Sequence, residues 1–168
     1  MQTVSLALQP LTKQAFAPFG DVVTTDDAEL RLINQGSTER FHDLADIDVT
    51  DEGGHAIVSL FRGQPFVPPV EIAMMERHPL GSQLFYPLSG RPFLAVVAPD
   101  EDGRPAAPLA FLCPPGLGVN YAKNTWHHPL LSLEAVSDFL VVDREGPGNN
   151  LEEFDYPGIR YRIDAVTP

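Results

Sequence analysis

The chain has 168 residues, 43% of them hydrophobic, a composition typical of a folded protein with a real core rather than a disordered one. Its formal net charge of −12 argues against a surface that binds nucleic acid or an anionic membrane, because both need clustered basic residues. No apolar run reaches the length of a membrane span, so we expect no membrane segment.

The start of the chain lacks the basic and apolar stretches of a signal peptide. The single cysteine, Cys113, has no partner for an internal disulfide. These two features favour a cytoplasmic protein. The length and the even composition predict a single domain over residues 1–168.

The sequence predicts little helix and many short strands. One helix is expected to begin after Thr12, whose hydroxyl can cap it, and to end before Pro18 and Gly20. The 17 prolines and 13 glycines are spread through the chain, and such frequent breaks suit short strands. Strands are expected over residues 21–25, 57–62, 70–78, 83–88, 93–98, 109–112, 119–121, 127–131, 136–143 and 159–163.

Two of the breaks are strong. Asp102-Gly103 lies at the centre of a turn over residues 99–105, and residues 145–150 form a polar loop rich in Gly and Asn. Many strands with few short helices predict a mainly β fold, a jelly-roll β-barrel, which leaves few exposed strand edges. No Gly-rich phosphate loop is present, so we expect neither a nucleotide nor a flavin cofactor.

Candidate functional residues lie in two segments. Glu76 and His78 are two apart in an expected strand, so their side chains leave the same face, and Gln83 follows in the next strand. His127 and His128 are neighbours, and on a regular strand only one of them can enter a cavity. Their position favours His127, whereas a β-bulge would reverse the pair.

The two segments resemble the two halves of the cupin signature, His-x-His with a later Glu and Gly, and Pro-x-Gly-x-x-His. Glu76 stands in the place of the first His and Gln83 in the place of the Glu. Asn124 stands in the place of the second-half glycine, and Asn also adopts left-handed backbone conformations. The resemblance implies a cupin-like fold, and its departures at Glu76 and Gln83 favour an acid–base and hydrogen-bonding site whose metal is weak or optional. The candidate metal ligands are Glu76, His78, Gln83 and His127.

Over roughly 130 residues in order, the chain also resembles a narrower family, the ureidoglycolate lyases (formerly called hydrolases) of allantoin degradation. The matching segments are residues 16–22, 33–34, 39–45, 76–81, 118–121, 126–130 and 138–144. The resemblance implies a carbon–nitrogen lyase of purine catabolism and nitrogen assimilation. Such an enzyme converts (S)-ureidoglycolate to glyoxylate and urea. It further implies a homodimer and a divalent metal, nickel.

The implied catalytic residues are Glu76, His78 and His127. Arg62 is a candidate anchor for the substrate carboxylate, because a guanidinium pairs with a carboxylate through two hydrogen bonds. Further substrate-binding candidates are Gln83, Tyr121 and Lys123. Asp138, on an apolar strand, either orients a site group or pairs with an arginine.

Two other function classes stay open at this stage. One is a cupin-like module that binds a small acid without turnover. The other is a different metal-dependent cupin enzyme, although Glu76 and Gln83 depart from the two-His, one-carboxylate ligand set of iron oxygenases.

Overall fold

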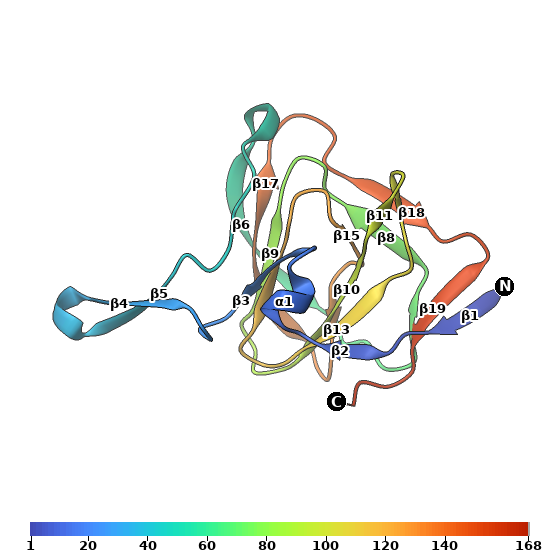
Figure 1. Ribbon diagram of the computed structural model, residues 1–168, viewed down its shortest axis with the longest axis horizontal. Helices are drawn as coiled ribbons and strands as arrows, with labels where there is room; N and C mark the ends of the chain where they lie inside the picture. The colour runs from blue at the N-terminus through green and yellow to red at the C-terminus, as the bar shows by residue number, and fades with distance from the viewer. Residues whose placement is uncertain (168) are drawn as a thin grey trace.

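The computed structural model describes residues 1–167, which form a mainly β structure with one short α-helix (Figure 1). Most strands belong to three hydrogen-bonded sheets of seven, five and three strands. The seven-stranded sheet lies between the other two, since its two faces contribute to two different hydrophobic cores. Within the described residues, no helix is both long and apolar enough to cross a membrane.

The middle sheet is organised around β10. All six residues of this strand are buried, and alternate residues point to opposite faces. Ala95 and Val97 pack into the core against the five-stranded sheet, which we call the first core. Leu94 and Val96 pack into the core against the three-stranded sheet, which we call the second core. In the order of the sheet the strands are β18 (Glu152–Asp155), β8 (Met74–Arg77), β15 (Trp126–His127), β10 (Phe93–Ala98), β13 (Leu109–Cys113) and β2 (Leu8–Pro10), with β16 (Leu131–Ser132) also paired to β10.

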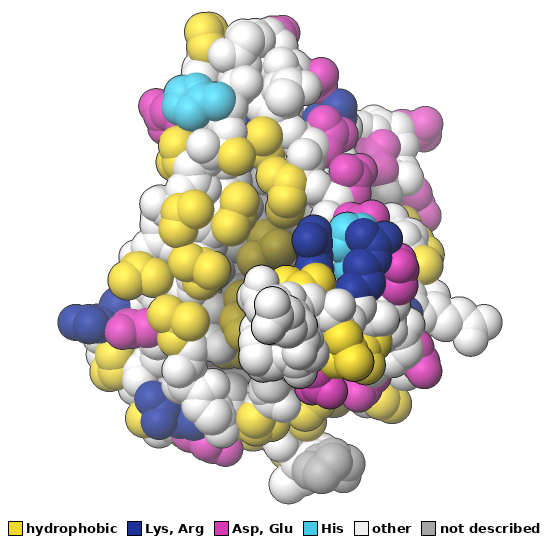
Figure 2. All heavy atoms as spheres, turned by 90° about the vertical axis from the view of Figure 1, so that its left-hand side faces the viewer, with side chains coloured by type: hydrophobic (Ala, Val, Ile, Leu, Met, Phe, Trp, Pro, Cys, Tyr) yellow, Lys and Arg dark blue, Asp and Glu magenta, His cyan; other side chains and the backbone are white. Residues whose placement is uncertain are grey.

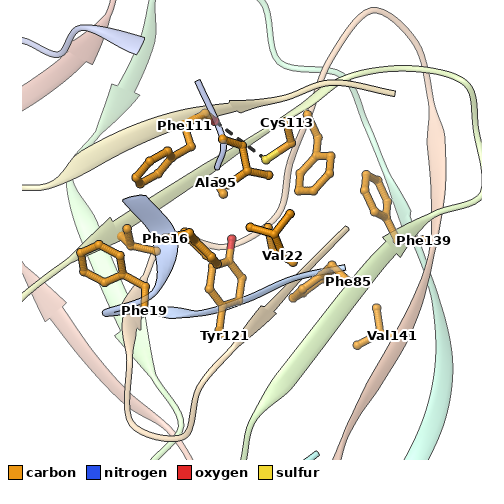
Figure 3. Packing of buried hydrophobic residues seen from close by; sticks show 14 residues of the cluster. Phe16, Phe19, Val22, Phe85, Ala95, Phe111, Cys113, Tyr121, Phe139 and Val141 are labelled. Carbon is orange, nitrogen blue, oxygen red and sulfur yellow. Dashed lines mark hydrogen bonds between the residues drawn. The ribbon is translucent and has the colours of Figure 1, made fainter. Parts of the chain in front are cut away.

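The five-stranded sheet is antiparallel throughout and faces the first core. Phe85, Tyr121 and Phe139 point from it into the first core, to which β13 contributes Phe111 (Figure 3). The rings of Phe85 and Phe139 meet edge to face at a centroid distance of 6.4 Å, a geometry that aromatic quadrupoles favour. Its strands are β3 (Gly20–Val23), β14 (Gly118–Tyr121), β9 (Gln83–Pro87), β17 (Ser137–Glu145) and β6 (His55–Gly63).

The three-stranded sheet covers the opposite face of the middle sheet. It consists of β1 (Gln2–Ser5), β19 (Ile159–Ile163) and β7 (Val70–Ile72). Ile72 and Ile163 are fully buried and pack in the second core with Met75 of β8.

The helix α1 (Lys13–Phe16) closes one end of the first core with the buried Phe16. The Thr12 hydroxyl accepts a hydrogen bond from the Ala15 backbone N–H at 3.1 Å, which confirms the expected cap. The remaining short elements are the 3₁₀ turns η1 (Asn34–Gly36) and η2 (Asp51–Gly53) and the hairpin of β11 (Asp100–Glu101) and β12 (Arg104–Pro105).

One hairpin projects from the body, and we call residues 29–42 the arm (Figure 1). Its strands β4 (Glu29–Ile33) and β5 (Thr38–His42) pair with each other and with no other strand of residues 1–167. Leu30 and Leu32 lie two apart on β4, and Phe41 is paired with Leu30, so these three side chains share one face of the ribbon. All three are exposed.

The structure confirms the mainly β expectation with few short helices. The two larger sheets pack face to face as a β-sandwich, as in a double-sheet jelly roll. Within residues 1–167, the hydrogen bonds form separate sheets rather than one closed barrel.

The expected strand over residues 70–78 is wrong as a single element. The chain breaks at Ala73, so β7 belongs to the three-stranded sheet and β8 to the middle sheet. Val70 and Ile72 consequently pack in the second core instead of sharing a face with Glu76. The expected strand over residues 127–131 is likewise two short strands, β15 and β16. Strands β1, β2, β11, β12, β18 and the two strands of the arm lie outside the expected ranges.

Candidate active site

Four polar residues meet between the middle sheet and the five-stranded sheet. Glu76 of β8 is directly paired with His127 of β15, so their side chains share a face. Gln83 of β9 enters from the facing sheet, and His78 follows the end of β8. The Glu76 Oε1 lies 3.4 Å from the His127 Nε2 and 3.8 Å from the His78 Nε2. The Gln83 Oε1 lies 3.2 Å from the His78 Nε2.

Backbone carbonyls set the tautomer of both histidines. The His78 Nδ1 lies 2.9 Å from the carbonyl oxygen of Asn150, and the His127 Nδ1 lies 3.0 Å from that of Thr125. A carbonyl oxygen only accepts, so each Nδ1 carries the proton and donates it. In the neutral imidazole, each Nε2 then presents a lone pair to the centre of the site.

The cluster therefore directs acceptor atoms at one another. The two Nε2 atoms, the Glu76 Oε1 and the Gln83 Oε1 are all acceptors, and the buried His127 Nε2 has no hydrogen-bond partner among residues 1–167. Ligand atoms of Glu76, His78 and His127 all lie within 4.8 Å of one another. Two imidazoles and a carboxylate suit a divalent first-row metal. The unpartnered nitrogen shows that this chain's residues fit such an ion.

The surrounding structure holds the two histidines in place. The ring of Tyr121 stacks on that of His127 at a centroid distance of 4.3 Å and an interplanar angle of 10°. Asn124 adopts the left-handed conformation, with φ 66°, and its backbone N–H donates to the His78 carbonyl at 2.9 Å. The turn before His127 is thereby tied to the strand end that carries His78.

The pKa values of Glu76 and His78 are both lowered, which leaves Glu76 charged and His78 neutral at neutral pH. Burial raises the pKa of the Glu76 carboxyl, but the neighbouring imidazoles of His127 and His78 outweigh burial and bring this pKa below its usual range. Burial lowers the pKa of His78, and the neighbouring His127 lowers it further. Glu76 is thus an ionised base next to a neutral imidazole at neutral pH.

A cavity of about 400 Å³ opens onto the cluster. Glu76 and Gln83 form its polar floor, and Phe61, Phe66 and Leu130 contribute apolar wall. A small polar molecule can therefore reach Glu76 while the wall excludes part of the surrounding water.

The structure does not bring every candidate residue into contact with the cluster. Arg62 lines the cavity, but its exposed guanidinium donates two hydrogen bonds to Asp138, at 2.8 and 3.1 Å. Asp138 therefore forms an ion pair with Arg62 and does not orient a residue of the site. The Lys123 ammonium lies 2.6 Å from Asp51 and 3.2 Å from Asp48.

Sequence reasoning missed one polar neighbour, Asp143, which accepts a hydrogen bond from the Gln83 Nε2 at 3.2 Å. The alternation of residues along β17 could have identified Asp143. Phe139 and Val141 point into the first core, so strand alternation also turns Asp143 inward and Asp138 outward. The carbonyls of Thr125 and Asn150 carried no signal, because a backbone contact is independent of the side chain.

Comparison with known proteins identifies relatives along the whole chain. A family model described as ureidoglycolate lyase matches residues 3–163. A protein of Brucella anthropi named ureidoglycolate lyase is 56% identical over 168 residues, covering 100% of this chain and 99% of the relative. One of Rhizobium meliloti, named ureidoglycolate lyase 1, is 59% identical over 151 residues, covering 90% of this chain and 89% of the relative.

Among solved structures, a 3,4-ketoisomerase from Helicobacter canadensis aligns with a TM-score of 0.40 and 15% identity. The alignment covers 76% of this chain and 84% of that one. This likeness is too distant to support a statement about activity.

Proposed function

The chain belongs to the ureidoglycolate lyase family, and from this premise we propose that it cleaves (S)-ureidoglycolate to glyoxylate and urea. The observation that carries the proposal is the convergence of Glu76, His78, Gln83 and His127 in one cluster, of which Glu76 and Gln83 line a cavity. The proposal places this reaction in allantoin degradation and in the cytoplasm.

The reaction needs a proton relay and no redox step. One carbon of ureidoglycolate carries a hydroxyl, a ureido nitrogen and a carboxylate. Loss of the hydroxyl proton lets the oxygen form a carbonyl while the carbon–nitrogen bond breaks. The bonding electrons leave with the nitrogen, which takes up a proton to give urea.

Glu76 is the proposed base. Its pKa lies below the usual range, so the carboxylate is ionised at neutral pH and can accept the hydroxyl proton. The leaving nitrogen is attached to the same carbon as the hydroxyl, so the same carboxyl group can return the proton to it. His78 and His127 favour the ionised form of Glu76, which is the form present before the first step and again after the second.

A divalent metal ion is the proposed cofactor, held by His78, His127 and Glu76 with Gln83 as a weaker oxygen ligand. When bound, such an ion lowers the pKa of a coordinated hydroxyl and offsets the charge of a carboxylate. Nickel is the metal we propose, and imidazole nitrogens are suitable ligands for it.

The other candidate residues have supporting roles or none in the proposal. Arg62 lines the cavity, but its guanidinium is paired with Asp138, and we assign it no contact with the substrate carboxylate. Tyr121 fixes the ring plane of His127 by stacking on it. Lys123 is held by two aspartates, and we assign it no contact with the substrate.

Purified protein loaded with nickel or manganese tests the proposal. It should release urea and glyoxylate in equal amounts from (S)-ureidoglycolate, faster than buffer with the same metal. Release of ammonia instead of urea would indicate hydrolysis rather than lyase chemistry. Binding without turnover would leave only a small-acid-binding module.

We also propose that the chain forms a homodimer through the arm and the outer face of the five-stranded sheet. Figure 2 shows apolar side chains gathered on this side of the molecule. Val58 and Leu60 of β6 are 67% and 66% exposed, and Leu32 of the arm is 66% exposed. Under a twofold axis, the arm of each copy can cover the apolar sheet face of the other.

Size-exclusion chromatography with light scattering tests the dimer. Leu32→Asp and Leu60→Asp should each give a monomer, because each places a charge in the proposed interface. Arg40→Asp is the control, since Arg40 is paired with Arg31 on the opposite face of the ribbon and should leave the dimer intact. A wild-type protein that runs as a monomer would refute the interface.

A further inference from the structure

Asp143 lies behind Gln83, on the side away from His78. The Gln83 amide spans the two residues: its Nε2 donates to the Asp143 Oδ2 at 3.2 Å, and its Oε1 lies 3.2 Å from the His78 Nε2. Gln83 is buried, and the Asp143 Oδ1 is buried with no hydrogen-bond partner in the described part of the chain. The cluster thus has a carboxylate that neither the cavity floor nor the proposed mechanism uses.

The orientation of the Gln83 amide follows from this carboxylate. The Gln83 Nε2 donates to the Asp143 Oδ2, and a carboxylate oxygen accepts hydrogen bonds, so the amide NH₂ faces Asp143. The reversed amide would place two acceptor oxygens against each other in a buried site, which is unfavourable. The Gln83 oxygen is therefore directed at the His78 Nε2 and the centre of the cluster.

The geometry points to Asp143 as a positioning residue that holds Gln83 with its amide oxygen available to the metal site. It also supplies, one residue further out, the negative charge that the cupin signature carries at the position of Gln83. Asp143 acts through Gln83 and not on the substrate. This inference rests on the proposed metal-assisted function.

The first test replaces Asp143 by the isosteric Asn. An Asn side chain offers Gln83 either a donor or an acceptor, so the amide orientation is no longer fixed. Loss of a residue that orients a metal ligand typically costs about 10–100-fold in affinity or activity. We expect Asp143→Asn to weaken nickel binding, measured by calorimetry on the metal-stripped protein, by that factor and to lower kcat/KM similarly.

Glu145→Gln is the matched control. It removes the same charge from the same strand two residues along, where the side chain is exposed. Nickel affinity and kcat/KM should stay at the wild-type level. A long-range effect of net charge would instead weaken both variants equally.

A double variant separates positioning from general damage. Gln83→Glu alone places two carboxylates in contact and should destabilise the protein. With Asp143→Asn added, the Asn amide donates to the new Glu, and the charge is restored one residue closer to the metal. We expect the double variant to recover most of the nickel affinity lost in Asp143→Asn.

The outcomes distinguish the inference from the proposed function. If the wild type binds nickel and turns over but Asp143→Asn equals it in both, the inference is wrong and the function stands. If Asp143→Asn loses folding stability while keeping nickel affinity, Asp143 is a structural residue only. If the wild type neither binds metal nor releases urea, the proposed function fails and the inference fails with it.

Discussion

Two neighbouring strands each contribute one residue to the candidate site and one to a second polar cluster on the opposite face of the same sheet. On β8, Glu76 points into the site and Arg77 points away from it; on β15, His127 and Trp126 divide in the same way. The two clusters are built on the same two strands, with alternate side chains pointing to opposite faces of the sheet. Their hydrogen bonding is nevertheless opposite.

The outer cluster is saturated. Arg77 donates to Glu152 at 2.7 Å and to Asp100 at 2.9 Å, and its guanidinium lies 4.4 Å from the ring centroid of Trp126. The Trp126 indole N–H donates to the same Asp100 at 2.8 Å. The Arg77 guanidinium and the Trp126 N–H each have carboxylate acceptors, so this cluster holds strands together.

The inner cluster lacks donors. Each neutral histidine donates its one N–H to a backbone carbonyl. The Nε2 atoms and the Glu76 carboxylate therefore face one another as acceptors. An arrangement of this kind is unfavourable unless a cation occupies its centre. The comparison teaches that unmet hydrogen-bonding capacity, rather than the number of polar residues, distinguishes a site from a structural network.

The largest expected effect comes from breaking the inner cluster at Glu76. Glu76→Gln keeps the shape but cannot accept the hydroxyl proton, so kcat/KM for urea release should fall by about 10²–10⁴-fold. Arg77→Gln, one residue along, should change kcat/KM little once the protein is folded. Equal losses in the two variants would contradict the division between the clusters.

Breaking the outer cluster should affect stability instead. Arg77→Leu leaves Asp100 and Glu152 without their cation, and the free energy of unfolding should fall by about 1–3 kcal/mol. Arg104→Leu is the control, since Arg104 is exposed in the β11–β12 hairpin. Urea denaturation of both variants provides the measurement, and an unchanged midpoint for Arg77→Leu would count against a structural role.

The smallest effect concerns pH. Burial lowers the pKa of His78 in the folded protein below its value of 6.5 in the unfolded chain. The stability that depends on neutral His78 is therefore fully present above pH 6.5 and is lost as the pH falls below it, because the unfolded state takes up the proton first. Between pH 7.5 and 5, the metal-free wild type should lose more melting temperature than His78→Gln. Parallel curves would show that His78 is not buried as a neutral ring.

Much of this arrangement could be predicted from the sequence. The spacing of Glu76 and His78 and the position of His127 grouped them, and the structure places them together with Gln83. The strand break at Ala73 could not be predicted, because apolar alternation continues unbroken through Val70, Ile72 and Met74. Only the packing of two different sheets separates these residues.

The remaining differences between the sequence-based expectations and the structure arise from contacts between residues distant in the chain. Arg62 and Lys123 were attractive anchors in isolation, but Asp138, Asp48 and Asp51 already bind them in the folded protein. In the arm, Leu30 and Leu32 alternate as in a half-buried strand, yet every residue of β4 is exposed. A sequence read alone does not reveal which carboxylate meets which cation, nor a surface whose proposed partner is another copy.

Metal titration tests the central claim most directly. Nickel should be added to metal-stripped wild type, His127→Gln and Arg77→Gln, with heat and bound metal measured together. The unmet acceptors of the inner cluster predict one ion per chain in the wild type and in Arg77→Gln, and a much weaker site in His127→Gln. A wild type that binds no nickel, or a His127→Gln variant that binds it as tightly as the wild type, would contradict the account.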